Sequence, residues 1–235
     1  MINMETSKLS KIWNKHANQE KSKNYDFSLK NIKKSDDFNT QWLLKLSRQK
    51  KGKKLLDAGC GIGYFVTMAR NLGLKAEGID ISPEAVKIAK KRGEKVILGD
   101  LRKMSFKSRS FDIVLAEGSI EHFPETEKAM SEISRILKKN GIFIGNVPNK
   151  FTIFTITKII QQIFGIWKCG YEKSFTKSRI KNLLEKDFRT IEMKKSKIAI
   201  GTQHPILTRI IREIDSFLML FGLGGAHHYF YCIKK

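Results

Sequence analysis

The chain has 235 residues, of which 41% are hydrophobic and 29% are charged. This composition is typical of a folded globular protein and excludes disordered and fibrous classes. The formal net charge is +22, but the basic residues are scattered in pairs and triplets rather than gathered in one block. Scattering of this kind is typical of a lysine-rich proteome, while the charge excess leaves RNA and an anionic membrane surface open as partners.

The three cysteines, Cys60, Cys169 and Cys232, have no paired spacing and no accompanying histidine pattern. A sparse, odd count predicts a reducing compartment and argues against a disulfide framework or a zinc site. The apolar stretches 151–167 and 205–226 are interrupted by charged or amide side chains, so neither is expected to span a bilayer. We therefore expect a cytoplasmic protein, either soluble or peripheral at a membrane.

The predicted elements alternate between strand and helix after a helical N-terminal cap over residues 1–50. Within a main domain at 51–235, the core 53–147 has expected strands at 53–57, 75–80, 95–98, 111–116 and 141–147, and helices at 64–72, 83–92 and 125–138. Ser82 is the expected N-cap of the second of these helices, and Asn140-Gly141 the expected end of the third. Such alternation predicts a doubly wound α/β sheet.

After Pro148 the alternation stops. Helices are expected at 151–165, 176–186 and 206–221, and strands at 190–200 and 228–233. The last two strands are expected to form a hairpin-like edge of the sheet. Residues 148–186 and 200–228 are then insertions outside the core sheet.

The most informative segment is L-L-D-A-G-C-G-I-G-Y-F at residues 55–65, where an apolar strand leads into Gly59, Gly61 and Gly63. Glycine is needed where a backbone turns sharply or approaches a ligand without a Cβ in the way. In open α/β sheets the ligand lies at the carboxyl ends of the strands. The loop therefore predicts a nucleotide-like ligand.

The loop also selects among such ligands. Tyr64 stands where the dinucleotide fingerprint needs a small residue, and Gly52 is not followed by the Lys-Ser/Thr pair of a triphosphate loop. Asp57 at the strand end would repel a pyrophosphate, but it suits a ligand with a cationic amine. S-adenosyl-L-methionine (SAM) carries an ammonium and a sulfonium and has no phosphate, so SAM is favoured over NAD and ATP.

Two further carboxylates end the next two strands. Asp80 can accept hydrogen bonds from ribose hydroxyls, and Asp100 can accept one from the adenine amine. Taken alone, an Asp after a strand is as often a turn or cap residue. Three Asp at successive strand ends, together with the glycine loop, favour an adenosine site.

Residues 53–147 resemble the class I SAM-dependent methyltransferases, and within them the small-molecule group that includes quinone-biosynthesis enzymes. Residues 55–65 resemble the first motif of that family, Gly78–Ser82 its ribose loop and Gly99-Asp100 its adenine loop. The resemblance implies a Rossmann-like, seven-stranded sheet, mostly parallel with an antiparallel last strand and helical insertions. It also implies that SAM is bound by Asp57, Gly59, Cys60, Gly61, Gly63, Asp80, Ile81, Asp100, Leu101 and Glu117.

The candidate catalytic residue is His122, in E-G-S-I-E-H-F-P at residues 117–124. Methyl transfer mainly requires a held acceptor and excluded water, and a base helps where the acceptor must lose a proton. The alternative is that His122 only packs the next helix beside the cofactor. Related quinone O-methyltransferases carry E-x-x-E-H here, but Gly118 replaces their first Glu, so no metal is expected.

The methyl acceptor is expected to lie against residues 1–50 and the acceptor-side insertions at 148–186 and 200–228. Three functions stay open for this side of the protein. The first is methyl transfer to a small-molecule or lipid-like acceptor, quinone-type compounds included. The second is RNA methylation, although the D/N-P-P-Y/F and Pro-Cys motifs of two nucleic-acid chemistries are absent from the sequence. The third is a non-catalytic SAM-binding partner module. The apolar stripes in 151–167 and 206–221 are typical of a core; alternatively they form an entrance for a prenylated or acyl substrate at an anionic membrane.

Overall fold

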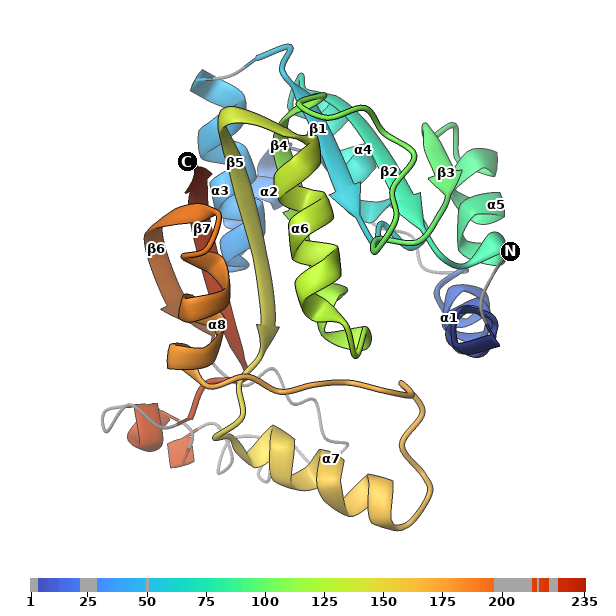
Figure 1. Cartoon of the computed structure of the whole chain (residues 1–235), viewed down its shortest axis with the longest axis vertical. Helices are drawn as coiled ribbons and strands as arrows, with labels where there is room; N and C mark the ends of the chain where they lie inside the picture. The colour runs from blue at the N-terminus through green and yellow to red at the C-terminus, as the bar shows by residue number, and fades with distance from the viewer. Residues whose placement is uncertain (1–3, 22–28, 50, 197–212, 215, 220–223) are drawn as a thin grey trace.

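The computed structural model describes residues 4–21, 29–49, 51–196, 213–214, 216–219 and 224–235, and a seven-stranded sheet forms its centre (Figure 1). The strands are β1 (Lys54–Ala58), β2 (Lys75–Asp80), β3 (Val96–Leu98), β4 (Phe111–Ala116), β5 (Leu137–Pro148), β6 (Phe188–Lys195) and β7 (His227–Lys234). Their order is β3-β2-β1-β4-β5-β7-β6. Strands β1 to β5 are parallel, and β7 is antiparallel to both β5 and β6. The predicted fold class is confirmed.

Helices cover both faces of the sheet. They are α1 (Met4–Glu20), α2 (Leu29–Lys34), α3 (Phe38–Gln49), α4 (Tyr64–Asn71), α5 (Pro83–Lys91), α6 (Thr126–Ile136), α7 (Ile153–Ile163) and α8 (Lys177–Leu184), with a 3-10 helix η1 (Ile120–His122). One core joins the sheet to α3, α4 and α5 through residues such as Leu43 and Val66. The other joins it to α6 and α8 through Ile133 and Leu183. Helical layers on both faces of this mostly parallel sheet leave the carboxyl ends of the parallel strands open for a ligand.

Two helices begin with a side-chain cap, and the cap at Ser82 is the predicted one. The Ser82 hydroxyl accepts a hydrogen bond from the Ala85 N–H, and Pro83 is the first residue of α5. The Thr176 hydroxyl accepts one from the Arg179 N–H at the start of α8. Side chains at these positions satisfy backbone donors that the helix itself leaves unpaired.

The helix expected over 125–138 was predicted two residues too long. α6 ends at Ile136, and Leu137 is already extended, with φ −71° and ψ 140°. Asn140 has φ +59° inside β5, and the pairing of β5 with β4 shifts register in this region. Asn140-Gly141 therefore forms a bulge within the strand rather than a helix end, because the extra residues must be absorbed before regular pairing resumes.

The helix expected at 206–221 lies mostly outside the described residues, although the positions described at 213–214 and 216–219 are helical. The strand expected at 190–200 begins earlier, at Phe188, and residues 197–200 are also outside the described part. Among the described helices, none is long and apolar enough to cross a membrane.

Candidate active site

The loop between β1 and α4 has three glycines with positive φ, at Gly59, Gly61 and Gly63. A Cβ on Gly59 would lie 2.4 Å from Cβ of Ser119, so only glycine lets the loop approach the chain that follows β4. A Cβ on Gly61 would meet no atom within 4 Å. Gly61 therefore borders open space, whereas Gly59 is in close backbone contact.

That open space is a cavity of about 180 Å³ at the carboxyl ends of the parallel strands. Its lining consists of Leu9, Trp13, Gly59, Gly61, Asp80, Ile81, Leu101, Glu117, Gly118, Ser119, His122 and Phe123. Seven of the residues singled out from the sequence are therefore together here: Gly59, Gly61, Asp80, Ile81, Leu101, Glu117 and His122. This is the place at which open α/β sheets bind ligands.

Four residues expected to bind the cofactor do not line this cavity: Asp57, Cys60, Gly63 and Asp100. The Cys60 side chain packs on β2, where a Cβ on Gly78 would lie 2.6 Å from its Sγ. Gly63 packs against Glu94, whose Cγ would lie 3.0 Å from an added Cβ. Cys60 and Gly63 thus hold the loop against its neighbours.

Asp80 ties the glycine loop to the start of α5. Its carboxylate accepts hydrogen bonds from the N–H of Gly61 (2.8 Å) and the N–H of Ser82 (2.8 Å), and the side chain also lines the cavity. Burial raises the pKa of Asp80, and the three backbone contacts that lower it offset this only in part. Each carboxylate oxygen keeps a further lone pair for a ligand hydroxyl.

Asp57 is buried behind the loop, with 2% of its surface exposed. Burial, and then the neighbouring charge of Asp80, raise the pKa of Asp57 to about 8. Two adjacent buried carboxyl groups favour one proton between them unless a cation is close. The electrostatics therefore suit a positively charged ligand.

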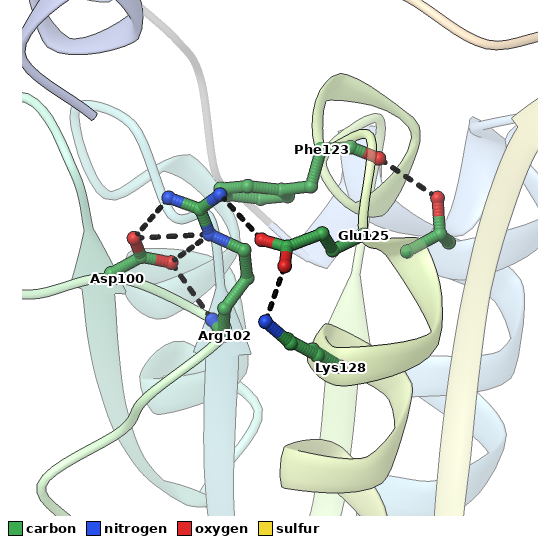
Figure 2. Close-up of polar contacts among 6 residues, drawn as sticks. Asp100, Arg102, Phe123, Glu125 and Lys128 are labelled. Atoms are coloured by element: carbon green, nitrogen blue, oxygen red, sulfur yellow. Dashed lines mark hydrogen bonds and ion pairs between the residues drawn. The ribbon is translucent and has the colours of Figure 1, made fainter. Parts of the chain in front are cut away.

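Asp100 is held by Arg102 (Figure 2). Its Oδ2 lies 2.8 Å from the Arg102 Nη2, and its Oδ1 accepts from the Arg102 N–H (2.8 Å). The same guanidinium reaches Glu125 Oε2 at 3.1 Å and lies 5.1 Å from the centre of the Phe123 ring. These contacts fix Leu101 and Phe123, two walls of the cavity, and occupy much of the carboxylate that was expected to bind an adenine amine.

Glu117 follows β4 and is held by two amides from distant elements. Oε1 accepts a hydrogen bond from the Asn146 Nδ2 (2.8 Å), and Oε2 accepts one from Asn39. Burial, and then the nearby charge of Asp37, raise the pKa of Glu117 to about 8 despite these two hydrogen bonds. The sequence alone did not identify Asn39, since only the packing of α3 on the sheet places it here.

His122 is held in one tautomer. Its Nδ1 lies 2.9 Å from the backbone oxygen of Tyr171. Because a carbonyl oxygen only accepts, Nδ1 carries the hydrogen and Nε2 has the lone pair. The ring of Trp13 meets His122 edge-on at 4.7 Å, and burial lowers the pKa of His122. A neutral imidazole with an unprotonated Nε2 can accept a proton or a hydrogen bond.

A second cavity, of about 340 Å³, adjoins the first. Its lining consists of Lys8, Leu9, Ile12, Arg102, His122, Phe123, Pro124, Gly170 and Tyr171. Leu9, His122 and Phe123 line both cavities. Helix α1, which forms a wall of each, is fixed to α5 through Asn14, whose Oδ1 accepts from the Ser82 hydroxyl at 2.6 Å. Leu9 and Trp13 were not predicted from the sequence, because one amphipathic helix does not show what it covers.

In the described part of the chain, no three His, Cys, Asp or Glu side chains are grouped as metal ligands would be.

Residues 56–145 match the family model of a methyltransferase domain. The match contains the glycine loop, Asp80, Leu101 and His122. Residues 56–145 are therefore a methyltransferase domain. SAM is the methyl donor of this family.

Two curated relatives share part of their sequence with this chain. An uncharacterised protein of Methanocaldococcus jannaschii is 33% identical over 177 residues, which are 74% of this chain and 62% of that protein. The sterol 4-C-methyltransferase of Caenorhabditis elegans is 34% identical over 97 residues, 38% of this chain and 29% of the relative. The chain therefore spans less than two thirds of either curated relative.

A solved methyltransferase of Haloferax volcanii, bound to the Trm112 methyltransferase activator, has the same fold. It superposes with a TM-score of 0.70 at 17% identity, and the match covers 96% of each chain.

Proposed function

We propose that the protein transfers a methyl group from SAM to a small, lipid-like acceptor. The observation that carries this proposal is the pair of adjoining cavities that share His122. One has the glycine loop and buried carboxylates that suit SAM. The other has mainly apolar walls, with Lys8 and Arg102 among its lining residues.

The residues of the first cavity fit SAM by shape and by charge. Gly61 leaves room for a ligand against the backbone, and Asp80 keeps acceptor capacity for ribose hydroxyls. Ile81 and Leu101 offer apolar walls to an adenine. Burial raises the pKa of Glu117, which lines this cavity, and of Asp57, which lies behind the glycine loop, to about 8, so a bound cation would stabilise the ionised form of each.

When bound, SAM supplies a methyl group already activated by its sulfonium. The chain then has to align the acceptor and exclude water. Leu9 and Trp13 of α1 close one side of the first cavity. His122, which lines both cavities, would take a proton from an acceptor hydroxyl or orient it.

The apolar second cavity favours a lipid-like acceptor. Two relatives are named as a sterol 4-C-methyltransferase and a squalene methyltransferase, and both names are consistent with that class. A quinone-type acceptor belongs to the same class of apolar compounds. RNA methylation has only the net charge of +22 in its support.

Asp80→Ala is expected to weaken binding of S-adenosylhomocysteine on the order of tenfold or more, because the ribose loses its acceptor and Gly61 loses its anchor. Isothermal titration calorimetry measures the affinity. Glu77→Ala is the matched control, since this carboxylate of the same strand pairs with Lys95 at the surface. Equal affinities of wild type and Asp80→Ala would refute the placement of SAM.

His122→Asn is expected to lower turnover on the order of a hundredfold while the affinity for S-adenosylhomocysteine stays unchanged. The Asn amide can still donate to the Tyr171 oxygen, so the variant removes the Nε2 lone pair and keeps the local contact. Single-turnover rates measured against pH distinguish a histidine that takes the proton from one that only orients the acceptor. A normal rate in His122→Asn would show that this histidine serves packing only.

A further inference from the structure

Helix α7 exposes its apolar side chains and buries polar ones, which is the reverse of an ordinary surface helix. The exposed apolar side chains on α7 and directly after it are Ile156 (59% exposed), Ile159 (49%), Ile160 (48%), Ile163 (75%), Phe164 (73%) and Ile166 (60%). Thr155 and Lys158 of the same helix are buried. A contiguous apolar surface of this kind marks a site of interaction.

The polar side of α7 is held by specific contacts. The Thr155 hydroxyl donates to the backbone oxygen of Asn149 at 2.7 Å. The Lys158 ammonium lies 3.0 Å from Glu172 Oε1 and donates to the Ser174 hydroxyl at 2.6 Å, and the Lys158 and Glu172 side chains are 5% and 8% exposed. Turning the helix to bury its isoleucines would break a buried ion pair, which is strongly unfavourable. These contacts therefore fix α7 with its apolar side chains facing outward.

The charged residues of the segment that carries this surface are all basic. Residues 150–171 contain three lysines and no Asp or Glu. Lys158 is the buried one, while Lys150 before α7 and Lys168 after it are exposed. An apolar helix face flanked by exposed lysines is the pattern of a helix that lies in the interface of an anionic bilayer. A second copy of this chain, with its own charge of +22, is a poorer partner for the same surface.

The segment that carries this surface leads directly into the wall of the second cavity. Gly170 and Tyr171, which follow it in the chain, line that cavity, and the Tyr171 backbone oxygen holds His122. Figure 1 shows α7 beyond the carboxyl end of β5, the end of the sheet at which the cavities lie.

We propose that α7 and residues 164–166 dock on an anionic lipid surface, from which the acceptor enters the second cavity. The entry of the acceptor rests on the proposed function, whereas docking does not require it.

The test is sedimentation with vesicles of phosphatidylcholine, alone or mixed with phosphatidylglycerol. The wild-type protein is expected to bind the mixed vesicles, and I163D/F164D to bind them about tenfold or more weakly. Ile191→Asp, which changes an isoleucine of β6 that is 51% exposed, is the matched control and should bind as wild type does. K150E/K168E should also lose binding relative to Lys139→Glu, an exposed lysine of β5.

Insertion is measured by quenching of Trp167 fluorescence with bromine-labelled lipids. Quenching is expected in the wild type and should be absent in Trp167→Phe. Wild-type binding by I163D/F164D, or a wild-type dimer that this variant dissociates, would overturn the proposal. An unchanged affinity of I163D/F164D for S-adenosylhomocysteine distinguishes a failure of docking from a failure of the proposed function.

Discussion

Asn in place of Asp57 is expected to stabilise the ligand-free protein at pH 8 by about 2 kcal/mol or more and to weaken SAM binding on the order of tenfold. The Asp57 carboxyl has a pKa of about 8 in the folded protein, against an ordinary value of 3.8, because it is buried beside Asp80. Asn has nearly the same shape but no proton to lose. The substitution therefore removes a cost of folding and also a charge that SAM needs.

The sign of the pH dependence follows from the protons bound. Between about pH 4 and pH 8 the folded protein keeps the Asp57 proton that the unfolded chain has released. The free energy of unfolding of the wild type therefore falls as the pH rises, by up to about 1.4 kcal/mol per pH unit from this group. SAM affinity changes in the opposite direction, since its positive charge favours the ionised carboxylate.

Urea denaturation of wild type and Asp57→Asn at several pH values between 6 and 8 measures this difference. The wild-type curve should fall relative to that of the variant as the pH rises. Asp112→Asn is the control: despite partial burial, the hydrogen bonds from Lys138 and the Lys54 backbone hold the pKa of Asp112 below its ordinary value, so its effect lies at acid pH. Parallel curves for wild type and Asp57→Asn would contradict the assigned pKa.

Alanine at two glycines of the loop is expected to give opposite phenotypes. Gly59→Ala should destabilise the fold by about 3 kcal/mol or more, because its φ is +87° and the new Cβ would lie 2.4 Å from Cβ of Ser119. Gly61→Ala should cost only about 1 kcal/mol, since its Cβ meets no protein atom. That Cβ instead occupies ligand space, so SAM affinity should fall on the order of a hundredfold.

Gly52→Ala is the matched control, with φ +76°, no atom within 4 Å of the new Cβ and no place in either cavity. It should show the same small loss of stability as Gly61→Ala and normal SAM binding. Thermal unfolding and calorimetry report the two effects separately. Normal SAM binding by Gly61→Ala would mean that the cavity does not hold the cofactor.

Local sequence signals were enough for the central sheet and the glycine loop. The strand at Lys75–Asp80 and the Ser82 cap depend on neighbours within a few residues, and both are as predicted. Asn140-Gly141 was misassigned because the same pair suits a helix end and a strand bulge, and the pairing of β4 with β5 decides between them. A local motif does not determine the register between two strands.

The residues that form the walls of the site could not be predicted, because long-range packing brings them together. Asn39 contacts Glu117 across 78 positions of sequence, and no single-helix pattern indicates that contact. The periodicity of α7 indicated an apolar stripe but not the side to which it turns; the buried contacts of Lys158 and Thr155 decide that it faces outward. The expected N-terminal cap at 1–50 and the expected insertions remain predictions as domain divisions.

The most direct test of the central claim is a partition assay with methyl-labelled SAM. The protein is incubated with an extract of its own cells, and the label is separated into organic-soluble, water-soluble and precipitable fractions, with Gly61→Ala as the inactive control. We expect label in the organic phase with the wild type and none above background with Gly61→Ala. Label confined to a nuclease-sensitive precipitate, or equal labelling by both proteins, would contradict transfer to a lipid-like acceptor from this cavity.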